Sequence, residues 1–236
     1  MTAPIGFFDS GVGGTSIWQE VVALLPNENT VYLADSKHAP YGEKSKEVIQ
    51  QLCVKNTELL LSKGCKIIIV ACNTATTNAI DFLRATYDVP IIGIEPAIKP
   101  ASLETKTNII GILATKGTLN SDLFEATSKS IRASVRIIEQ IGEGLVALVE
   151  NGQLQTKTTS NLLKRYLQPM LLQHIDCLVL GCTHYPYLIP QIREIIGNDI
   201  AIIDSGAAVA KQTHAVLAQY DLDCKEIQEQ ISHQFF

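Results

Sequence analysis

The chain has 236 residues, 46% of them hydrophobic, with a formal net charge of −5 and six cysteines. This length suits two α/β units better than one small domain. A negative charge without a basic stripe argues against nucleic acid as a partner, and no apolar run is long enough to span a membrane. The amino terminus lacks the pattern of a signal peptide, and no CxxC pair is present. We therefore expect a cytoplasmic protein with free thiols.

The first expected strand, residues 5–8, leads into a DSGVGG run at residues 9–14. The glycine spacing is not GxGxxG, so the run is a poor match to a dinucleotide site. Its glycines allow the backbone to approach another group closely. Asp9 and Ser10 have two interpretations: they cap the next helix or they point into a site.

The second expected strand, residues 31–34, runs into Asp35 and a loop that contains Pro40, Tyr41 and Gly42. A tyrosine at such a turn either packs as part of an ordinary turn or closes over a ligand. A helix is expected next, over residues 45–61, because its apolar residues recur at helical spacing.

Residues 66–77, KIIIVACNTATT, predict a buried parallel strand that ends at Cys72 and turns directly into a helix. Ligands of open α/β sheets bind at such strand ends, and a helix amino terminus favours a thiolate over a thiol. A second copy of the pattern, at residues 176–186, places Cys182 in the same setting. Two such cysteines indicate a pair of opposed thiols.

The second half of the chain resembles the first in layout. A connection at residues 97–107 precedes a strand at 108–113, which leads to Thr115 and Thr118. The near-constant offset between corresponding residues of the halves indicates an internal duplication, with chance similarity of βα units as the alternative. Glu150, at the end of an expected helix, is typical of a solvated position. The tail, residues 221–236, suggests no element.

Two thiols at matching strand ends leave several chemistries open. A metal site would combine Cys72, Cys182 and His184, but the short paired spacings of structural zinc are missing. A thiol enzyme with one nucleophile needs one cysteine and one histidine, which leaves the second thiol without a role. A dithiol redox pair needs sulfurs in bonding contact, which two units across a cleft do not readily supply.

Moving a proton from one face of a carbon to the other does require two opposed groups. A planar carbanion would form between Cys72 and Cys182, and its chirality would invert. A thiolate is a modest base, so hydrogen-bond donors in a dry pocket must stabilise the charge. The hydroxyls that suit this task belong to Ser10, Thr74 and Thr183. Asp9 is available beside one thiol and His184 beside the other. The sequence shows no lysine in a Schiff-base setting, so a pyridoxal cofactor is not implied.

Five segments, in order along the chain, resemble the signatures of the cofactor-independent glutamate racemase family. They are DSGVGG at residues 9–14, YLADSKHAPYG at 32–42, ACNTAT at 71–76, IIGIEPA at 91–97 and GCTHYPYL at 181–188. CNTAT combined with GCTHYP is highly specific. The resemblance implies that Cys72 and Cys182 are the acid–base thiols, with Cys182 serving the L- and Cys72 the D-enantiomer. It also implies that Asp9 and His184 assist them.

The resemblance assigns the substrate site as well. The residues that it places at the amino acid are Asp9, Ser10, Tyr41, Gly42, Asn73, Thr74, Thr115, Thr118, Glu150, Thr183 and His184. Residues 142–150, GEGLVALVE, depart from the Cys-Pro segment of many family members, so this wall of the pocket is expected to differ.

The fold implied by the resemblance is two pseudo-symmetric parallel-sheet α/β domains with the active site in the cleft between them. The first domain would comprise residues 1–96 and 206–236, and the second residues 97–205. The implied enzyme is a homodimer without cofactor or metal that interconverts L- and D-glutamate and supplies D-glutamate for peptidoglycan. An aspartate racemase of the same superfamily is the near alternative, and a ligand-binding protein with inert thiols is the alternative from another class.

Overall fold

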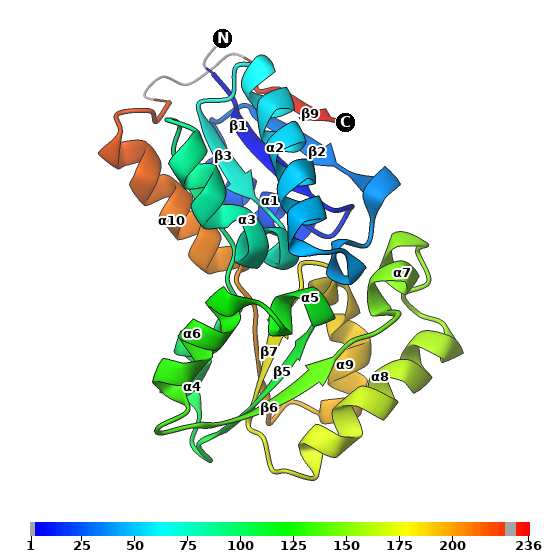
Figure 1. Ribbon diagram of the computed structural model, residues 1–236. Coiled ribbons are helices and arrows are strands. Elements are labelled where there is room, and N and C mark those ends of the chain that lie inside the picture. Colours follow the sequence, from blue (N-terminus) through cyan, green and yellow to red (C-terminus); the bar gives the residue numbers. More distant parts are fainter. Residues whose placement is uncertain (1–2, 225–229) are drawn as a thin grey trace.

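The computed structural model describes residues 3–224 and 230–236. These residues form two separate parallel sheets, one of five strands and one of four, each covered by helices on both faces. In Figure 1 the five-stranded sheet lies above the four-stranded sheet, and both chain ends belong to the upper unit. The fold class expected from the sequence is confirmed.

The first sheet has the strand order β4-β3-β1-β2-β9, and each neighbouring pair is parallel. Its strands are β1 (Ile5–Asp9), β2 (Thr30–Ala34), β3 (Ile67–Val70), β4 (Ile91–Gly93) and β9 (His233–Phe235). β1 and β3 are buried along their whole length because helices cover both of their faces, which explains their continuous apolar runs. β9 has no counterpart among the expected elements: the end of the chain pairs with β2, with His233 opposite Thr30.

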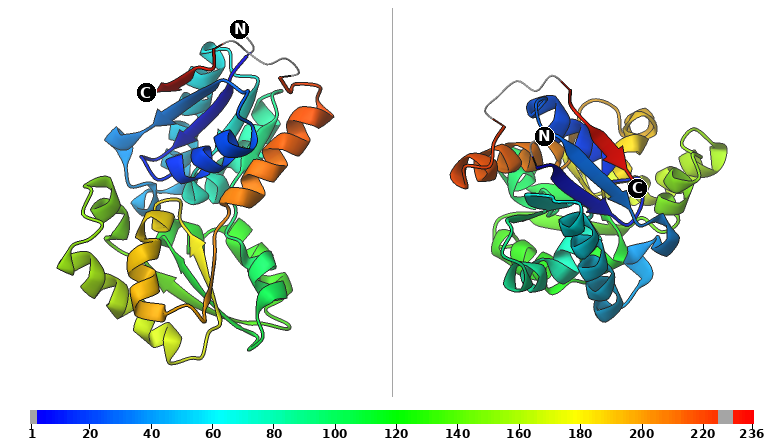
Figure 2. Two further views of the ribbon diagram at one scale, coloured as in Figure 1. Left: turned by 180° about the vertical axis from the view of Figure 1, so that it is seen from behind. Right: turned by 90° about the horizontal axis from the view of Figure 1, so that it is seen from above.

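In the part of the chain that the structure describes, four helices cover the first sheet. On one face α2 (Lys46–Ser62) and α3 (Asn73–Thr86) pack apolar side chains onto β1 and β3. On the other face lie α1 (Thr15–Leu24) and α10 (Gly206–Gln219), which also contact each other. α10 follows the second sheet in the chain, so the chain crosses back to cover the first; Figure 2 shows it alongside the first unit in orange. The short 3-10 helices η1 (Ser36–His38) and η2 (Tyr41–Glu43) follow β2.

The second sheet has the strand order β6-β5-β7-β8, again all parallel. Its strands are β5 (Ile109–Ala114), β6 (Arg136–Ile141), β7 (Cys177–Gly181) and β8 (Ala201–Ile203). Helices α4 (Ile98–Glu104) and α6 (Asp122–Ile131) pack on one face. The other face is covered by α7 (Leu145–Glu150), α8 (Lys157–Leu171) and α9 (Ile189–Ile196). The short helices α5 (Lys116–Leu119) and η3 (Tyr185–Leu188) follow β5 and β7.

The two sheets share one topology. The order β4-β3-β1-β2 in the first corresponds to β8-β7-β5-β6 in the second. Cys72 after β3 and Cys182 after β7 therefore occupy equivalent places, in agreement with an internal duplication. Because residues that follow β1, β3, β5 and β7 line one common pocket, the carboxyl ends of both sheets face the space between the units.

Two segments of chain connect the units, residues 94–97 and 204–205. A hydrogen bond that Ser205 Oγ donates to Glu95 O (2.6 Å) ties them together. We propose the domain division 1–96 plus 206–236 and 97–205, which places each sheet with the helices that cover it. No helix in the described parts of the chain is both long and apolar enough to cross a membrane.

Candidate active site

Cys72 lies where β3 ends and α3 begins. Its Sγ accepts a hydrogen bond from Ala75 N (3.4 Å) and lies 3.8 Å from Ser10 Oγ. The helix amino terminus favours a thiolate at this position. Burial, followed by the negative charge of Asp9, nevertheless raises the pKa of the Cys72 thiol well above its ordinary value. Burial outweighs the helix terminus, and Cys72 rests as a protonated thiol.

Cys182 lies at the equivalent end of β7, where it meets a histidine. Its Sγ is 3.7 Å from His184 Nδ1, and His184 Nε2 is 2.5 Å from Glu150 Oε1. Burial alone would lower the pKa of His184, but hydrogen bonds to Cys182 and Glu150, together with nearby negative charges, raise it well above its ordinary value. His184 is therefore held as a cation next to the sulfur of Cys182.

Glu150 is the partner that anchors this histidine. Burial acts to raise the pKa of Glu150, but the hydrogen bonds from His184 and from the backbone N–H of Val12 (2.8 Å) lower it overall. Its place at a helix end suggested a solvated residue. The structure instead turns its carboxylate inward, between a loop of the first unit and His184 of the second.

Asp9 ends β1 and is fully buried. Its Oδ2 accepts a hydrogen bond from Gly14 N (2.7 Å), which holds the loop that enters α1. Burial raises the pKa of Asp9 more than the positive charge of His184 and the hydrogen bonds from Gly14, Cys72 and Ser10 lower it. Asp9 therefore supports the loop before α1 without capping the helix itself, and it interacts with Cys72 and His184 from behind the pocket wall.

The two cysteines line one pocket between the units. Its walls are Ser10, Pro40, Tyr41, Gly42, Cys72, Asn73, Thr74, Thr115, Val146, Cys182, Thr183 and His184. Of these, Pro40 and Val146 were not among the expected site residues. Val146 lies one helical turn before Glu150 in α7, and this i, i+4 spacing was the available signal for it. It belongs to the segment where the resemblance to the glutamate racemase family departs.

Asp9, Thr118 and Glu150, expected at the substrate, lie behind these walls. Each contacts a residue that forms them: Asp9 contacts Cys72, Thr118 contacts Thr74, and Glu150 contacts His184.

Hydrogen-bonding groups converge on the pocket from both units. The hydroxyl oxygens of Thr74, Thr115 and Thr118 form a triangle with separations of 2.8, 3.2 and 3.0 Å. Asn73 is buried, and within the described residues its Nδ2 has no hydrogen-bond partner. A buried donor without a partner is costly, so a ligand that accepts its hydrogen bond would gain affinity there.

Two glycines of the DSGVGG run explain how the units approach each other. A Cβ on Gly11 would lie 1.9 Å from Glu150 Oε1, and one on Gly13 would lie 2.3 Å from His184 Nδ1. Any side chain at these positions would displace the His184–Glu150 pair. The run therefore serves close backbone approach, as its glycines suggested.

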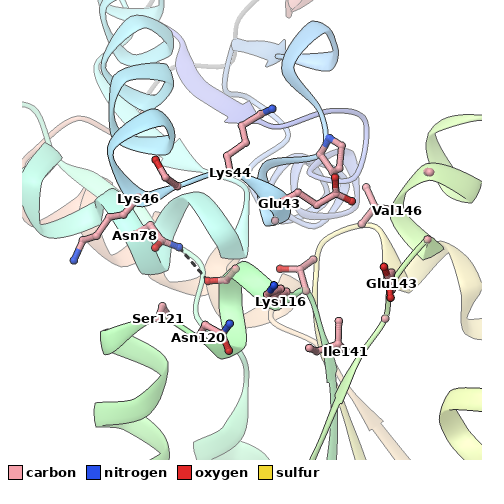
Figure 3. A pocket seen from close by; sticks show the side chains of 18 of the residues that line it. Glu43, Lys44, Lys46, Asn78, Lys116, Asn120, Ser121, Ile141, Glu143 and Val146 are labelled. Atoms are coloured by element: carbon pink, nitrogen blue, oxygen red, sulfur yellow. Dashed lines mark hydrogen bonds between the residues drawn. The ribbon is translucent and has the colours of Figure 1, made fainter.

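A larger cleft of about 840 Å³ opens outside the pocket and shares Pro40, Gly42, Thr115 and Val146 with it (Figure 3). Its rim carries charged side chains from both units. They are Glu43, Lys44, Lys46, Lys116, Asp122 and Glu143. A hydrogen bond from Asn78 Nδ2 to Gly117 O (3.2 Å), dashed in Figure 3, crosses between the units at its edge. The cleft therefore adjoins the pocket that holds the two thiols.

Within residues 3–224 and 230–236, no group of three or more His, Cys, Asp or Glu side chains is arranged to hold a metal ion. Cys72, Cys182 and His184, the set weighed as a metal site from the sequence, therefore does not form such a group.

The model of the Asp/Glu/hydantoin racemase family matches residues 9–213. The chain belongs to this family. The match spans both units and both cysteines, so the family covers the whole site and not one half of it. The resemblance inferred from the five sequence segments is confirmed.

Individual family members are similar over nearly the whole chain. A glutamate racemase of Ectopseudomonas mendocina is 48% identical over 221 residues, which cover 93% of this chain and 84% of the relative. The solved glutamate racemase of Escherichia coli, in complex with L-glutamate and the activator UDP-MurNAc-ala, has a TM-score of 0.87 at 32% identity, covering 99% of this chain and 89% of its own. That of Francisella tularensis, in complex with D-glutamate, has a TM-score of 0.86 at 29% identity, covering 99% and 87%.

Proposed function

We propose that the chain is a glutamate racemase that moves the Cα proton between two opposed thiols. The observation that carries this proposal is that Cys72 and Cys182, at equivalent ends of β3 and β7, line one small pocket from opposite units. Two acid–base groups on opposite sides of one ligand are what inversion at a carbon requires. Glutamate, rather than another amino acid, is proposed from the 48% identity to a glutamate racemase and from the glutamate-bound neighbours.

For L-glutamate we assign Cys182 as the base and Cys72 as the acid, following the family resemblance. His184 Nδ1 lies 3.7 Å from Cys182 Sγ and is placed to exchange a proton with it, whereas burial and the charge of Asp9 raise the pKa of Cys72. The Cys182 thiolate would take the Cα proton of L-glutamate, and Cys72 would deliver its own proton to the opposite face. For D-glutamate the roles reverse, and the reaction starts from the enzyme form in which Cys72 has lost its proton and Cys182 carries one.

The carbanion needs hydrogen-bond donors that stabilise its negative charge, because a thiolate is a weak base for a Cα proton. We assign the contacts with the substrate's carboxylates to hydroxyl and amide donors of the pocket and to the backbone N–H groups at strand ends. These donors are Ser10, Asn73, Thr74, Thr115 and Thr183, and Thr118 supports them through Thr74. Tyr41 and Gly42 close the pocket, Asp9 assists Cys72, and Glu150 assists Cys182 by holding His184.

Polarimetry or circular dichroism of purified protein with L-glutamate tests the function. We expect loss of optical rotation with L- and with D-glutamate, without added cofactor and in the presence of EDTA. Faster racemisation of L-aspartate than of L-glutamate would favour the aspartate racemase instead. Binding of glutamate without racemisation would favour the ligand-binding alternative. Activity that EDTA abolishes and a metal restores would contradict the two-thiol scheme.

The family resemblance supports three further proposals: a homodimer, a cytoplasmic location and the supply of D-glutamate for peptidoglycan. Light scattering at assay concentration tests the first. Growth of a strain that lacks the gene, with and without added D-glutamate, tests the last, and unaided growth would contradict it.

A further inference from the structure

A second buried polar cluster adjoins the pocket wall at Tyr41. Tyr41 Oη donates a hydrogen bond to Asp35 Oδ2 (2.6 Å) and accepts one from Asn56 Nδ2 (3.0 Å). The other carboxylate oxygen of Asp35 is 2.6 Å from His38 Nδ1. Asp35, Tyr41 and Asn56 are each at most 7% exposed. The cluster ties the end of β2 and the middle of α2 to the segment that carries Tyr41.

These bonds commit the hydroxyl of Tyr41. A phenol has one proton to donate, and this one goes to Asp35. Burial and then the hydrogen bond to Asp35 raise the pKa of Tyr41, so it keeps that proton. Tyr41 nevertheless lines the pocket. What it offers to a substrate is its ring and its main chain, and its hydroxyl faces the protein.

The position of this segment is critical because the space around it is narrow. Pro40, Tyr41 and Gly42 line the pocket, and a Cβ on Gly42 would lie 3.0 Å from Thr115 of the other unit. The segment consists of short 3-10 turns between β2 and α2 and has no strand or long helix to hold it. A small shift would move its backbone against Thr115 or away from a bound ligand.

We propose that Asp35 and Asn56 are positioning residues that fix residues 40–42 against the substrate through the hydroxyl of Tyr41. The proposal rests on the proposed racemase function. Neither side chain lines the pocket, so each acts on the reaction only through Tyr41. The Asp35 carboxylate accepts a hydrogen bond from the Tyr41 hydroxyl, and the Asn56 amide donates one to it. Two bonds from two different elements hold the pocket wall more rigidly than either bond alone.

A double-mutant cycle tests the anchor. Tyr41→Phe, Asp35→Asn and Asn56→Leu are made singly, and Tyr41→Phe is combined with each of the other two. We expect Tyr41→Phe to raise KM for both enantiomers on the order of tenfold, with kcat within about twofold, because coupled residues of one network contribute at this scale. Each double variant should have about the KM of Tyr41→Phe alone, since the anchor is already lost. Tyr87→Phe, which removes an outlying hydroxyl of the same unit, is the matched control and should leave KM unchanged.

Three outcomes would overturn the proposal. Losses that multiply in the double variants would mean that the Tyr41 hydroxyl meets the substrate directly. A fall in kcat with unchanged KM would mean that the variants only lose folded enzyme. Unchanged kinetics in all single variants would mean that the wall needs no anchor. L- and D-glutamate have equal free energy, so kcat/KM must be equal in the two directions for every variant. This equality checks the fitted kinetic constants.

The proposed function can fail separately. If the wild type does not racemise glutamate, the same cycle is read from dissociation constants for L- and D-glutamate measured by calorimetry. Non-additive losses of affinity would then support the anchor, and additive losses would overturn it.

Discussion

At the residue scale, the two thiols of equivalent strands have different neighbours. Cys72 is next to the buried Asp9, and Cys182 is next to the His184 cation that Glu150 holds. The duplicated topology thus carries an asymmetric charge distribution. The asymmetry gives each thiol its own ionisable neighbour, Asp9 beside Cys72 and His184 beside Cys182.

The two-thiol scheme predicts how isotope enters the product. In deuterated water, early product from either enantiomer should carry deuterium at Cα while recovered substrate stays protiated, because the donating thiol exchanges with solvent before substrate arrives. Cys72→Ser and Cys182→Ser should each abolish racemisation, since a hydroxyl is a far weaker acid than a thiol. Proton NMR and mass spectrometry of both enantiomers make the measurement. Original proton found in the product, or near wild-type racemisation by either variant, would contradict the scheme.

The pair of Glu150 and His184 predicts a pH-dependent contribution to stability. Because the pKa of Glu150 is lowered in the folded state, its ionised form stabilises the fold at pH values above the ordinary pKa of 4.5. This contribution is lost as the pH falls through the lowered pKa. Because the pKa of His184 is raised in the folded state, its protonated form stabilises the fold at pH values below the ordinary pKa of 6.5. This contribution is lost as the pH rises through the raised pKa. The melting-temperature difference between wild type and Glu150→Gln should therefore be largest between pH 4.5 and 6.5.

Thermal unfolding across the pH range checks this, with Glu58→Gln as the control for loss of a surface carboxylate. A difference that is flat with pH would argue against an ionised pair.

Site residues were predictable where a reactive side chain stands next to a recognisable local sequence pattern. Cys72 and Cys182 each follow an uninterrupted apolar run, which indicates the end of a buried strand without reference to distant residues. Only the family resemblance placed Glu150 at the site; its own segment does not indicate the inward turn, because that turn depends on the backbone of Val12 and the ring of His184, both remote in sequence. The direction of the Tyr41 hydroxyl depends in the same way on Asn56.

At the element scale, the loop at residues 9–14 is shaped by what lies against it. We expect Gly13→Ala to lower kcat on the order of a hundredfold, because its methyl group would overlap the His184 ring and displace it from Cys182. Gly64→Ala is the control: Gly64 has φ of +78° and no atoms nearby, so its change should cost about 1 kcal/mol of stability without affecting turnover by folded enzyme. Normal kcat in Gly13→Ala would show that the loop yields instead of the histidine.

The strand β9 escaped prediction because three residues carry too little pattern to identify a strand. Its place depends on long-range contacts: Trp18 packs edge-on against His233 and Phe235 at 5.4 and 5.0 Å between ring centroids. The same contacts make Trp18, the one tryptophan of the chain, a reporter of this strand.

Ending the chain at residue 231 should lower the melting temperature by about 5–10 °C, through loss of ladder hydrogen bonds and of the aromatic cluster. Trp18 fluorescence should shift to the red, and the exposed edge of β2 should promote aggregation. Tyr220→Ala, which removes an exposed aromatic ring near the same end, is the control. An unchanged melting temperature and spectrum would mean that β9 contributes nothing to stability.

At the scale of the whole molecule, contacts between the units close the site from two sides. Near Cys182, Thr15 Oγ1 lies 2.5 Å from Tyr187 Oη, and Ser16 Oγ donates to Thr183 O (3.0 Å). On the opposite side Thr74 bonds Thr115 (2.8 Å). Cys72 and Cys182 are only 5% and 6% exposed between these contacts. An amino acid therefore enters only when the units or their side chains move apart.

This closure predicts the reactivity of the thiols. With iodoacetamide, Cys72 and Cys182 should react more slowly than the more exposed Cys224, and saturating glutamate should slow them further while leaving Cys224 unaffected. Peptide mass spectrometry over time measures each site, and Cys224→Ser removes the competing thiol. Fast labelling of Cys72 and Cys182 at a rate that glutamate does not change would mean that the pocket is open.

The return of α10 and β9 to the first unit also has a consequence for how the protein is made. On the ribosome, β1 to β4 emerge before the second unit, yet α10, which shares one of their faces with α1, and β9 at their edge are synthesised after it. The second sheet comes from one continuous stretch of chain and completes its contacts earlier. The first unit must therefore stay partly uncovered until α10 and β9 have been synthesised, after the whole of the second unit.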